Sequence, residues 1–187
     1  MRYRLSKYDP AHRDRVTGAY LRDDWTSVSD IGGAFDGRVL TAAAYLDVED
    51  RYVDAIQRFV CEYGGAVRIS DLDGPNGTCR ANDLTRDALR EVEDGVRRAQ
   101  RQTPEVPEVA IDVARVVAAE RLGGDAIDAL TRLGLRESLW CKLVGEGFEI
   151  FFGYDYLVGI TAPRELPEAE RHAVGRGLFV ERVARRS

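Results

Sequence analysis

One run of apolar side chains, at spacings of three and four residues, restricts the fold of this chain more than any other feature. It lies in residues 41–63 and consists of Tyr45, Val48, Tyr52, Ile56, Phe59 and Tyr63. At about 100° per residue these side chains fall within about 80° of one another, so they form a single stripe. We predict a helix over 41–63, with Thr41 as its N-cap and Gly64–Gly65 as its end. Such a stripe must pack against a second layer of structure.

The strongest strand signal lies towards the C-terminal end. Apolar residues alternate with other residues in 138–144 and again from residue 148, and a Gly-Glu-Gly turn separates the two runs. This pattern predicts a hairpin of 138–144 with 148–160, with Gly153 and Gly159 as bulges. Shorter strands are predicted at 3–7, 66–72 and 178–180.

Further helices are predicted at 84–101, 109–121 and 125–134, and from Pro167 onwards. Residues 109–121 also alternate as a strand would, and the helix is the preferred interpretation. The segments 9–37, 71–77 and 102–108 are predicted as loops. The expected fold class is α+β, with a mixed or antiparallel sheet and a C-terminal β-hairpin packed against three to five helices. We expect a single domain over 1–187, and any subdomain boundary should fall near 102–108.

Charge and hydropathy exclude several classes of protein. The 187 residues include 32 acids and 27 bases, which leaves a net charge of −5, and 44% of the residues are hydrophobic. Only residues 182–187 form a basic segment, so we expect no nucleic-acid binding. No window reaches the ~18 apolar residues that a membrane helix needs, and the N-terminus has no apolar signal region. We therefore expect a cytoplasmic protein.

The cysteines and histidines do not indicate a metal or cofactor site. Cys61, Cys79 and Cys141 are far apart, odd in number and outside any CxxC pattern, so we expect reduced thiols. His12 and His172 lie among charged residues, so a surface position is a simpler interpretation for them than a catalytic role. No glycine-rich phosphate loop is present. We expect neither a metal nor a cofactor.

Glu49 is the one acid that falls inside the apolar stripe, about 40° from Tyr45 on the helical wheel. A carboxylate in that position must be ion-paired, bound by a hydroxyl group or raised in pKa. The preferred interpretation is a bridge to one of the 25 arginines, since Lys7 and Lys142 are the only lysines among 27 bases. The alternative is a tuned acid in a pocket.

Two segments combine acids with aromatic residues and are candidate binding surfaces. The first lies in the irregular N-terminal stretch and contains Asp23, Asp24, Trp25 and Asp30. The second is Tyr154, Asp155 and Tyr156, after the predicted hairpin. Aromatic residues of this kind occur both in cores and at interface hot spots, so core packing remains open for both segments. Asp155 is also a candidate general acid.

Parts of the chain resemble a known kind of protein. They are Lys7-Tyr8-Asp9-Pro10, residues 24–27 and 29–32, Leu135-Arg136-Glu137, residues 139–143 and 152–156, and residues 177–181. Together these segments, under half of the chain, are similar to uncharacterised cytosolic bacterial proteins of the toxin-immunity type. The resemblance implies a protein that needs a stable fold and a surface complementary to its toxin, with no catalytic residue.

The leading hypothesis is therefore a protein-binding module, an immunity protein that neutralises a bacterial toxin by direct binding. Its net acidity suits a basic toxin. One alternative is a small hydrolase or transferase that uses Glu49 or Asp155 as its acid–base group. It requires the two carboxylates to share a pocket without a neutralising arginine. The other alternative is a homo-oligomeric structural protein.

Overall fold

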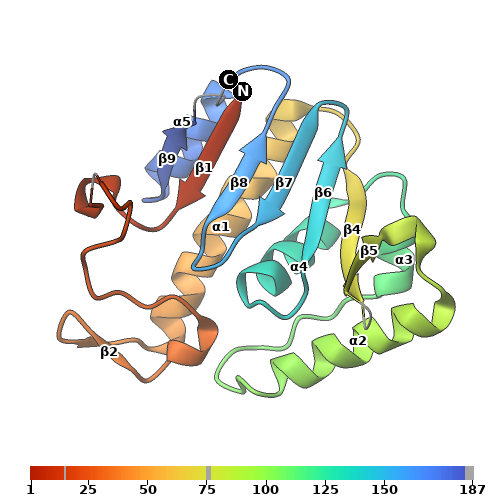
Figure 1. Ribbon diagram of the computed structural model, residues 1–187, viewed down its shortest axis with the longest axis horizontal. Helices are drawn as coiled ribbons and strands as arrows, with labels where there is room; N and C mark the ends of the chain where they lie inside the picture. Colours follow the sequence, from red (N-terminus) through yellow and green to blue (C-terminus); the bar gives the residue numbers. More distant parts are fainter. Residues whose placement is uncertain (15, 75–76, 184–187) are drawn as a thin grey trace.

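The computed structural model describes residues 1–14, 16–74 and 77–183 and is shown in Figure 1. Its strands are β1 (Arg2–Ser6), β2 (Ala34–Phe35), β3 (Arg38–Val39), β4 (Arg68–Gly74), β5 (Gly77–Arg80), β6 (Cys141–Gly145), β7 (Phe148–Phe152), β8 (Val158–Thr161) and β9 (Phe179–Arg182). Its α-helices are α1 (Ala42–Tyr63), α2 (Arg86–Gln100), α3 (Val113–Ala118), α4 (Gly124–Leu135) and α5 (Pro167–Gly175). Short 3₁₀ helices span Pro10–His12, Val28–Asp30 and Ala81–Asp83.

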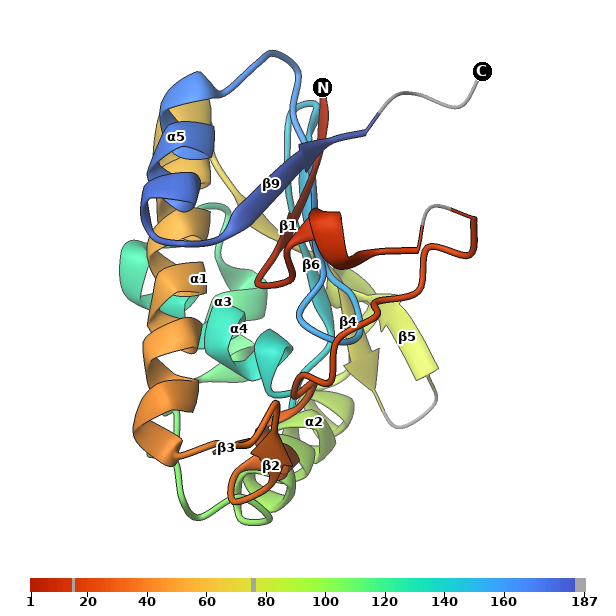
Figure 2. The ribbon, with the colours of Figure 1, turned by 90° about the vertical axis from the view of Figure 1, so that its left-hand side faces the viewer.

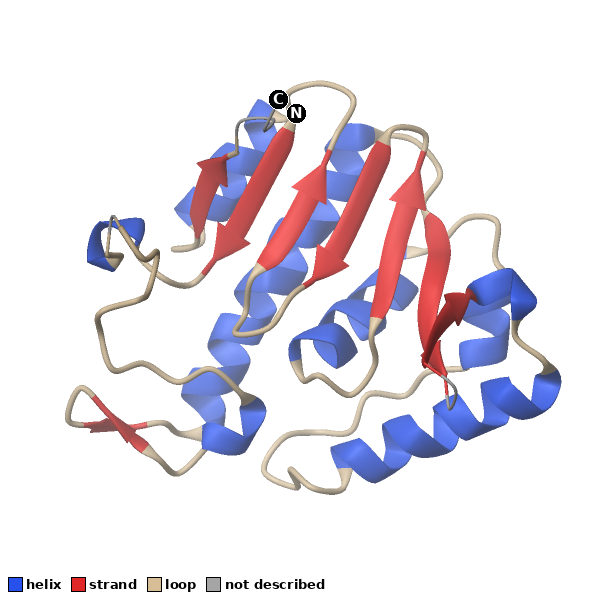
Figure 3. Cartoon of the chain, viewed as in Figure 1, coloured by secondary structure: helices blue, strands red, loops and turns tan. Residues whose placement is uncertain are grey.

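Within the described residues, seven strands form one sheet in the order β5-β4-β6-β7-β8-β1-β9. Every neighbouring pair is antiparallel, and β2 and β3 form a separate two-stranded hairpin. Helices and strands pack together, as Figure 3 shows, so the α+β fold class predicted from the sequence is confirmed. The hairpin of β6 with β7 is the predicted C-terminal hairpin.

The first predicted helix is α1, and it begins and ends where its capping residues indicate. The Thr41 side chain accepts a hydrogen bond from the Ala44 amide, and Gly64 adopts the left-handed conformation with φ 78°. A residue with a Cβ is strained at such an angle, which is why a glycine follows the helix. Tyr45, Tyr52 and Phe59 of the stripe are fully buried. The apolar stripe is therefore the face that α1 turns to the core.

The long helix lies with α4 and α5 against one face of the sheet (Figure 2). The alternation of side chains in the strands explains this arrangement. In β7, Phe148, Ile150 and Phe152 are buried, whereas Glu149 is half-buried and Phe151 is exposed. Phe151 points to the other face, where its ring covers Gly159 of the next strand.

One continuous hydrophobic cluster joins residues on both sides of the 102–108 connector.

Three predicted boundaries differ from the structure. The predicted strand 148–160 is two strands, β7 and β8, joined by a turn over 153–157. The predicted loop 71–77 is instead largely a hairpin, because β4 continues to Gly74 and pairs with β5; residues 75–76 lie outside the described residues. The predicted helix 109–121 is helical only over α3, since Asp112 caps the helix and so sets its start.

Among the cysteines, Cys61 is exposed and Cys141 is buried, and both are free thiols. The side chain of Cys79 is outside what the structure describes. None of the helices in the described ranges combines the length and apolar composition that a bilayer crossing requires.

Candidate functional site

The two candidate segments of the sequence meet at one end of the sheet. The ring of Tyr156 lies 4.9 Å from that of Trp25 and 5.6 Å from that of Tyr52, measured between centroids. Tyr45 completes the cluster, 5.4 Å from Trp25 and 6.1 Å from Tyr156. All four side chains are buried. This aromatic cluster, defined by Trp25, Tyr45, Tyr52 and Tyr156, joins the N-terminal loop, helix α1 and the 153–157 turn.

The turn explains why Tyr156 points inwards while its neighbours do not. Asp155 and Tyr156 have φ angles of 55° and 59°, and the amide of Leu157 donates to the carbonyl of Tyr154 at 3.1 Å. Two successive positive φ angles are typical of a type I′ turn, in which non-glycine residues are strained. The turn buries Tyr156 and leaves Tyr154 and Asp155 exposed, with Tyr154 at 70% of its full exposure.

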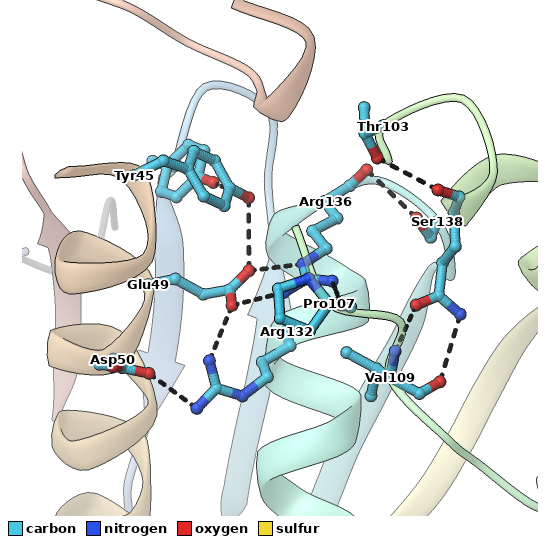
Figure 4. A network of polar contacts seen from close by, with 11 residues as sticks. Tyr45, Glu49, Asp50, Thr103, Pro107, Val109, Arg132, Arg136 and Ser138 are labelled. Carbon is cyan, nitrogen blue, oxygen red and sulfur yellow. Dashed lines mark hydrogen bonds and ion pairs between the residues drawn. The ribbon is translucent and has the colours of Figure 1, made fainter. Parts of the chain in front are cut away.

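Glu49 lies beside this cluster and is completely buried. Arg136 donates from Nε and Nη2 to the two carboxylate oxygens, at 2.7 and 2.8 Å. Arg132 donates from Nη1 to Oε2 at 2.7 Å and also binds Asp50, as Figure 4 shows. The Tyr45 hydroxyl donates to Oε1 at 3.3 Å. The carboxylate therefore accepts four hydrogen bonds and lies against two positively charged guanidinium groups.

The charges of this network shift the pKa of its members. Burial alone lowers the pKa of Arg136, but hydrogen bonding to Glu49 and its negative charge outweigh burial, so the pKa is raised. Burial, with the charge of Glu49, raises the pKa of Tyr45, and burial raises that of Tyr156. Since the Tyr156 hydroxyl donates to that of Tyr45, the two phenols extend the network into the aromatic cluster. Both phenols therefore stay protonated at neutral pH.

Lys7 ties the N-terminal loop to the same region. Its Nζ forms an ion pair with Oδ1 of Asp24 at 2.9 Å. The same atom lies 3.9 Å from the centre of the Trp25 ring and 4.3 Å from that of Tyr8, which are cation–π distances. Burial lowers the pKa of Lys7 to about 8, and Asp24 and Asp30 act in the opposite direction.

The other acids predicted in the N-terminal segment have different surroundings. Asp30 accepts hydrogen bonds from the amides of Thr26 and Ser27, which cap the short helix Val28–Asp30. Asp23 is exposed. Burial raises the pKa of Tyr8, and the negative charges of Asp24, Asp155 and Asp30 raise it further.

Burial changes the interpretation of two candidate contacts. Trp25 is 8% exposed and Tyr156 only 2%, so in this conformation neither side chain is available to touch a partner. Of the residues proposed for binding, Asp23, Tyr154 and Asp155 are exposed, and Asp24 and Asp30 are partly so. The buried Trp25 and Tyr156 instead belong to the aromatic cluster that packs under the exposed residues.

Several residues of the site were not identified from the sequence. The ring of Trp140 lies 5.0 Å from that of the exposed Tyr154, the residue before Asp155. Burial, and then the charge of Asp155, raises the pKa of Glu137, so these two carboxylates are also close. The spacing of Arg132 and Arg136 is the one signal that the sequence offered for these two residues, because side chains four residues apart lie on the same side of a helix. Nothing in the sequence tied them to Glu49.

No group of three or more metal-ligating side chains comes together in the part of the chain that the structure describes. Comparison with protein-family models, with curated proteins and with solved structures finds no match for this chain.

Proposed function

We propose that this chain is a protein-binding module of the toxin-immunity type, which neutralises a basic protein toxin by direct contact. The observation that carries the proposal is the meeting of the two candidate segments at one end of the sheet. There Tyr154 and Asp155 lie exposed next to the buried Tyr156, and Asp23 is exposed two residues before the buried Trp25. We call these three residues the contact surface.

The buried cluster supports such a role because it fixes the turn. The Tyr52 hydroxyl donates to the carbonyl of Tyr156 at 2.6 Å, and the Tyr156 ring packs on Trp25. A contact that is held rigid before binding loses less conformational freedom on association. Tyr154 is then an aromatic anchor of the kind that dominates binding energy at protein interfaces.

Charge supports a basic partner. Asp23 and Asp155 are exposed acids, Glu137 lies close to Asp155, and the whole chain has a net charge of −5. Complementary charge accelerates association with a positively charged protein and disfavours acidic partners.

The acid–base alternative is not favoured by the geometry. It needs an uncompensated carboxylate in a pocket, but the Glu49 carboxylate is bound by Arg132 and Arg136. Asp155 is exposed on the turn. Sedimentation of the purified chain tests the homo-oligomeric alternative.

The test is co-expression with the protein encoded by the neighbouring gene. We expect the chain to protect growth when that protein is produced and to co-purify with it. The double variant Tyr154→Ala/Asp155→Arg should weaken the complex by at least about tenfold in calorimetry, because it removes the anchor and reverses a charge. Absence of both protection and complex would contradict the proposal.

A matched control is the variant Val174→Ala/Glu105→Arg, which also removes an exposed apolar side chain and reverses an exposed acid. Val174 lies on α5 and Glu105 in the connector, both outside the contact surface. This variant should bind like the parent chain. Equal losses in both variants would show that the contact surface has no special part in binding.

A further inference from the structure

A groove of about 360 Å³ lies beside the contact surface, between α2 and the segment 138–140. Its floor is apolar, because Val92, Val96 and Leu139 are 7%, 3% and 4% exposed. In Figure 1 the helix passes beneath the ends of β4 and β6, where this segment enters the sheet. The floor of the groove is thus part of the edge of the hydrophobic core.

Trp140 forms one side of the groove and links it to Tyr154. The amide of Asp73 in β4 donates to the carbonyl of Trp140 at 3.0 Å, which fixes the backbone of residue 140 to the sheet. The indole ring is half-buried and rests against the ring of Tyr154. The groove and the contact surface therefore share an aromatic pair.

The rim carries more negative than positive charge. Glu91, Asp94 and Asp73 line the groove together with one cation, Arg98. Asp94 also has an exposed ion pair with Arg97 at 3.3 Å. Glu137 precedes Trp140 by three residues, and Asp155 follows Tyr154, whose ring contacts that of Trp140.

Gly95 deepens the helical side of the groove. A Cβ built on this glycine would find only the Arg98 guanidinium within 4 Å, at 3.9 Å. The helix surface is therefore open at this glycine, and the guanidinium of Arg98 lies next to the opening.

We infer that this groove binds an arginine or lysine side chain of the protein partner. The inference rests on the proposed function and names the chemistry that the partner presents. The aliphatic part of such a side chain matches the apolar floor, its charge matches the acidic rim, and the face of Trp140 attracts a cation. Arg98 lines the same groove, and its positive charge repels an incoming cation.

The first test uses a defined probe, the peptide acetyl-Gly-Arg-Gly-Arg-Gly-amide. Titration should shift the indole N–H signal of Trp140 in a ¹H–¹⁵N spectrum and reach saturation at millimolar peptide. The peptide with citrulline in place of arginine has nearly the same shape and no charge, and it should not bind. Equal shifts with both peptides, or no shift with arginine, would overturn the inference.

Substitutions of groove residues test whether the arginine peptide binds in the groove. Glu91→Gln/Asp94→Asn should weaken the arginine peptide by about fivefold or more, since the rim loses two charges. Arg98→Ala should strengthen it, because a repelling positive charge is removed. Gly95→Leu should fill the groove and abolish binding. Asp87→Asn, an exposed acid one turn away on α2, is the matched control and should leave binding unchanged. Loss of affinity in the control to the same extent would show only a general charge effect.

The inference and the proposed function fail separately. If the neighbouring-gene protein binds but Glu91→Gln/Asp94→Asn and Gly95→Leu leave its affinity unchanged, the inference is wrong and the proposed function stands. If the arginine peptide occupies the groove but the chain neither protects growth nor forms a complex, the proposed function is wrong.

Discussion

Glu49 and Arg136, 87 residues apart in the sequence, form a two-pronged ion pair in which both side chains are almost completely buried. The carboxylate is on α1, and the guanidinium follows the last turn of α4. Arg136 also donates to the carbonyl of Pro107 at 2.7 Å. One side chain thus joins two helices and the 102–108 connector.

Removal of the Glu49 charge should destabilise the protein strongly. In Glu49→Gln the buried guanidinium of Arg136 loses its counter-charge, and such a loss costs about 3 kcal/mol or more. Chemical denaturation measures the change in the free energy of unfolding. The neighbouring acid Asp50 is 54% exposed and also binds Arg132, so Asp50→Asn should cost less than about 1 kcal/mol. Similar costs for both variants would contradict a special role of the buried pair.

Stability should rise with pH above neutrality, because the folded-state pKa of Lys7, about 8, lies below its ordinary value of 10.5. Between these values the unfolded chain binds a proton that the folded chain does not, so the free energy of unfolding increases with pH. Lys7 alone contributes about 2 kcal/mol between pH 7.5 and 9.5. Burial raises the pKa of the Cys141 thiol to about 12, so the unfolded chain loses that proton first and the net gain should be about 1 kcal/mol. Above pH 10 the raised pKa values of Tyr8 and Tyr45 act in the opposite direction, since the unfolded chain then loses protons first.

The control for Lys7 is Lys7→Met, whose unbranched side chain is one atom shorter and cannot titrate. Its free energy of unfolding should fall by about 1 kcal/mol over the same pH interval, because the raised pKa of the buried Cys141 thiol is then no longer offset by Lys7. A rise of equal size in the variant would assign the effect to another group.

Two helical glycines should respond oppositely to alanine. A Cβ at Gly134 would lie 2.7 Å from the ring of the buried Phe152, so Gly134→Ala should cost about 1–3 kcal/mol. Gly95 has room for a Cβ, and Gly95→Ala should stabilise α2 by up to about 1 kcal/mol. Thermal unfolding of the two variants checks both signs. A stabilising Gly134→Ala would show that α4 and β7 are not packed this closely.

Asp155→Asn should lower the pKa of Glu137. Desolvation raises that pKa first and the negative charge of Asp155 raises it further, so only the second part is removed. Asparagine tolerates a positive φ angle well, and the turn should therefore keep its shape. A carboxyl titration followed by NMR measures the change. Asp125→Asn, an exposed acid at the start of α4, is the control and should leave the pKa of Glu137 where it was.

Local patterns were sufficient for elements whose residues interact with near neighbours. The apolar stripe, Thr41 and Gly64 defined α1 almost to the residue, because capping and amphipathicity act within a few positions. The β6–β7 hairpin was predictable for the same reason. By contrast, β5 lies in a stretch rich in Gly, Pro and Asn, and only its pairing with β4 stabilises it as a strand.

The candidate site was only partly predictable. The segments of Trp25 and Tyr156 were identified, but the polar residues beside Trp25 and the acid before Tyr156 gave no sign that the two rings would be buried against each other. The stripe position of Glu49 indicated that a partner was needed, whereas the identity of Arg136 depended on how α4 packs on α1. Contacts between distant segments follow from tertiary packing, which a local pattern does not encode.

The position of β1 between β8 and β9 has a consequence for biosynthesis. Residues 2–6 leave the ribosome long before residues 158–161 and 179–182, with which they pair. Until the intervening chain has been translated, both edges of β1 lack their native hydrogen-bonding partners. Closure of so long a segment is slow, and until then the unpaired edges of β1 and the apolar side chains of Tyr3 and Leu5 are open to the aggregation that chaperones prevent. The last strands to be synthesised thus complete the sheet around the first.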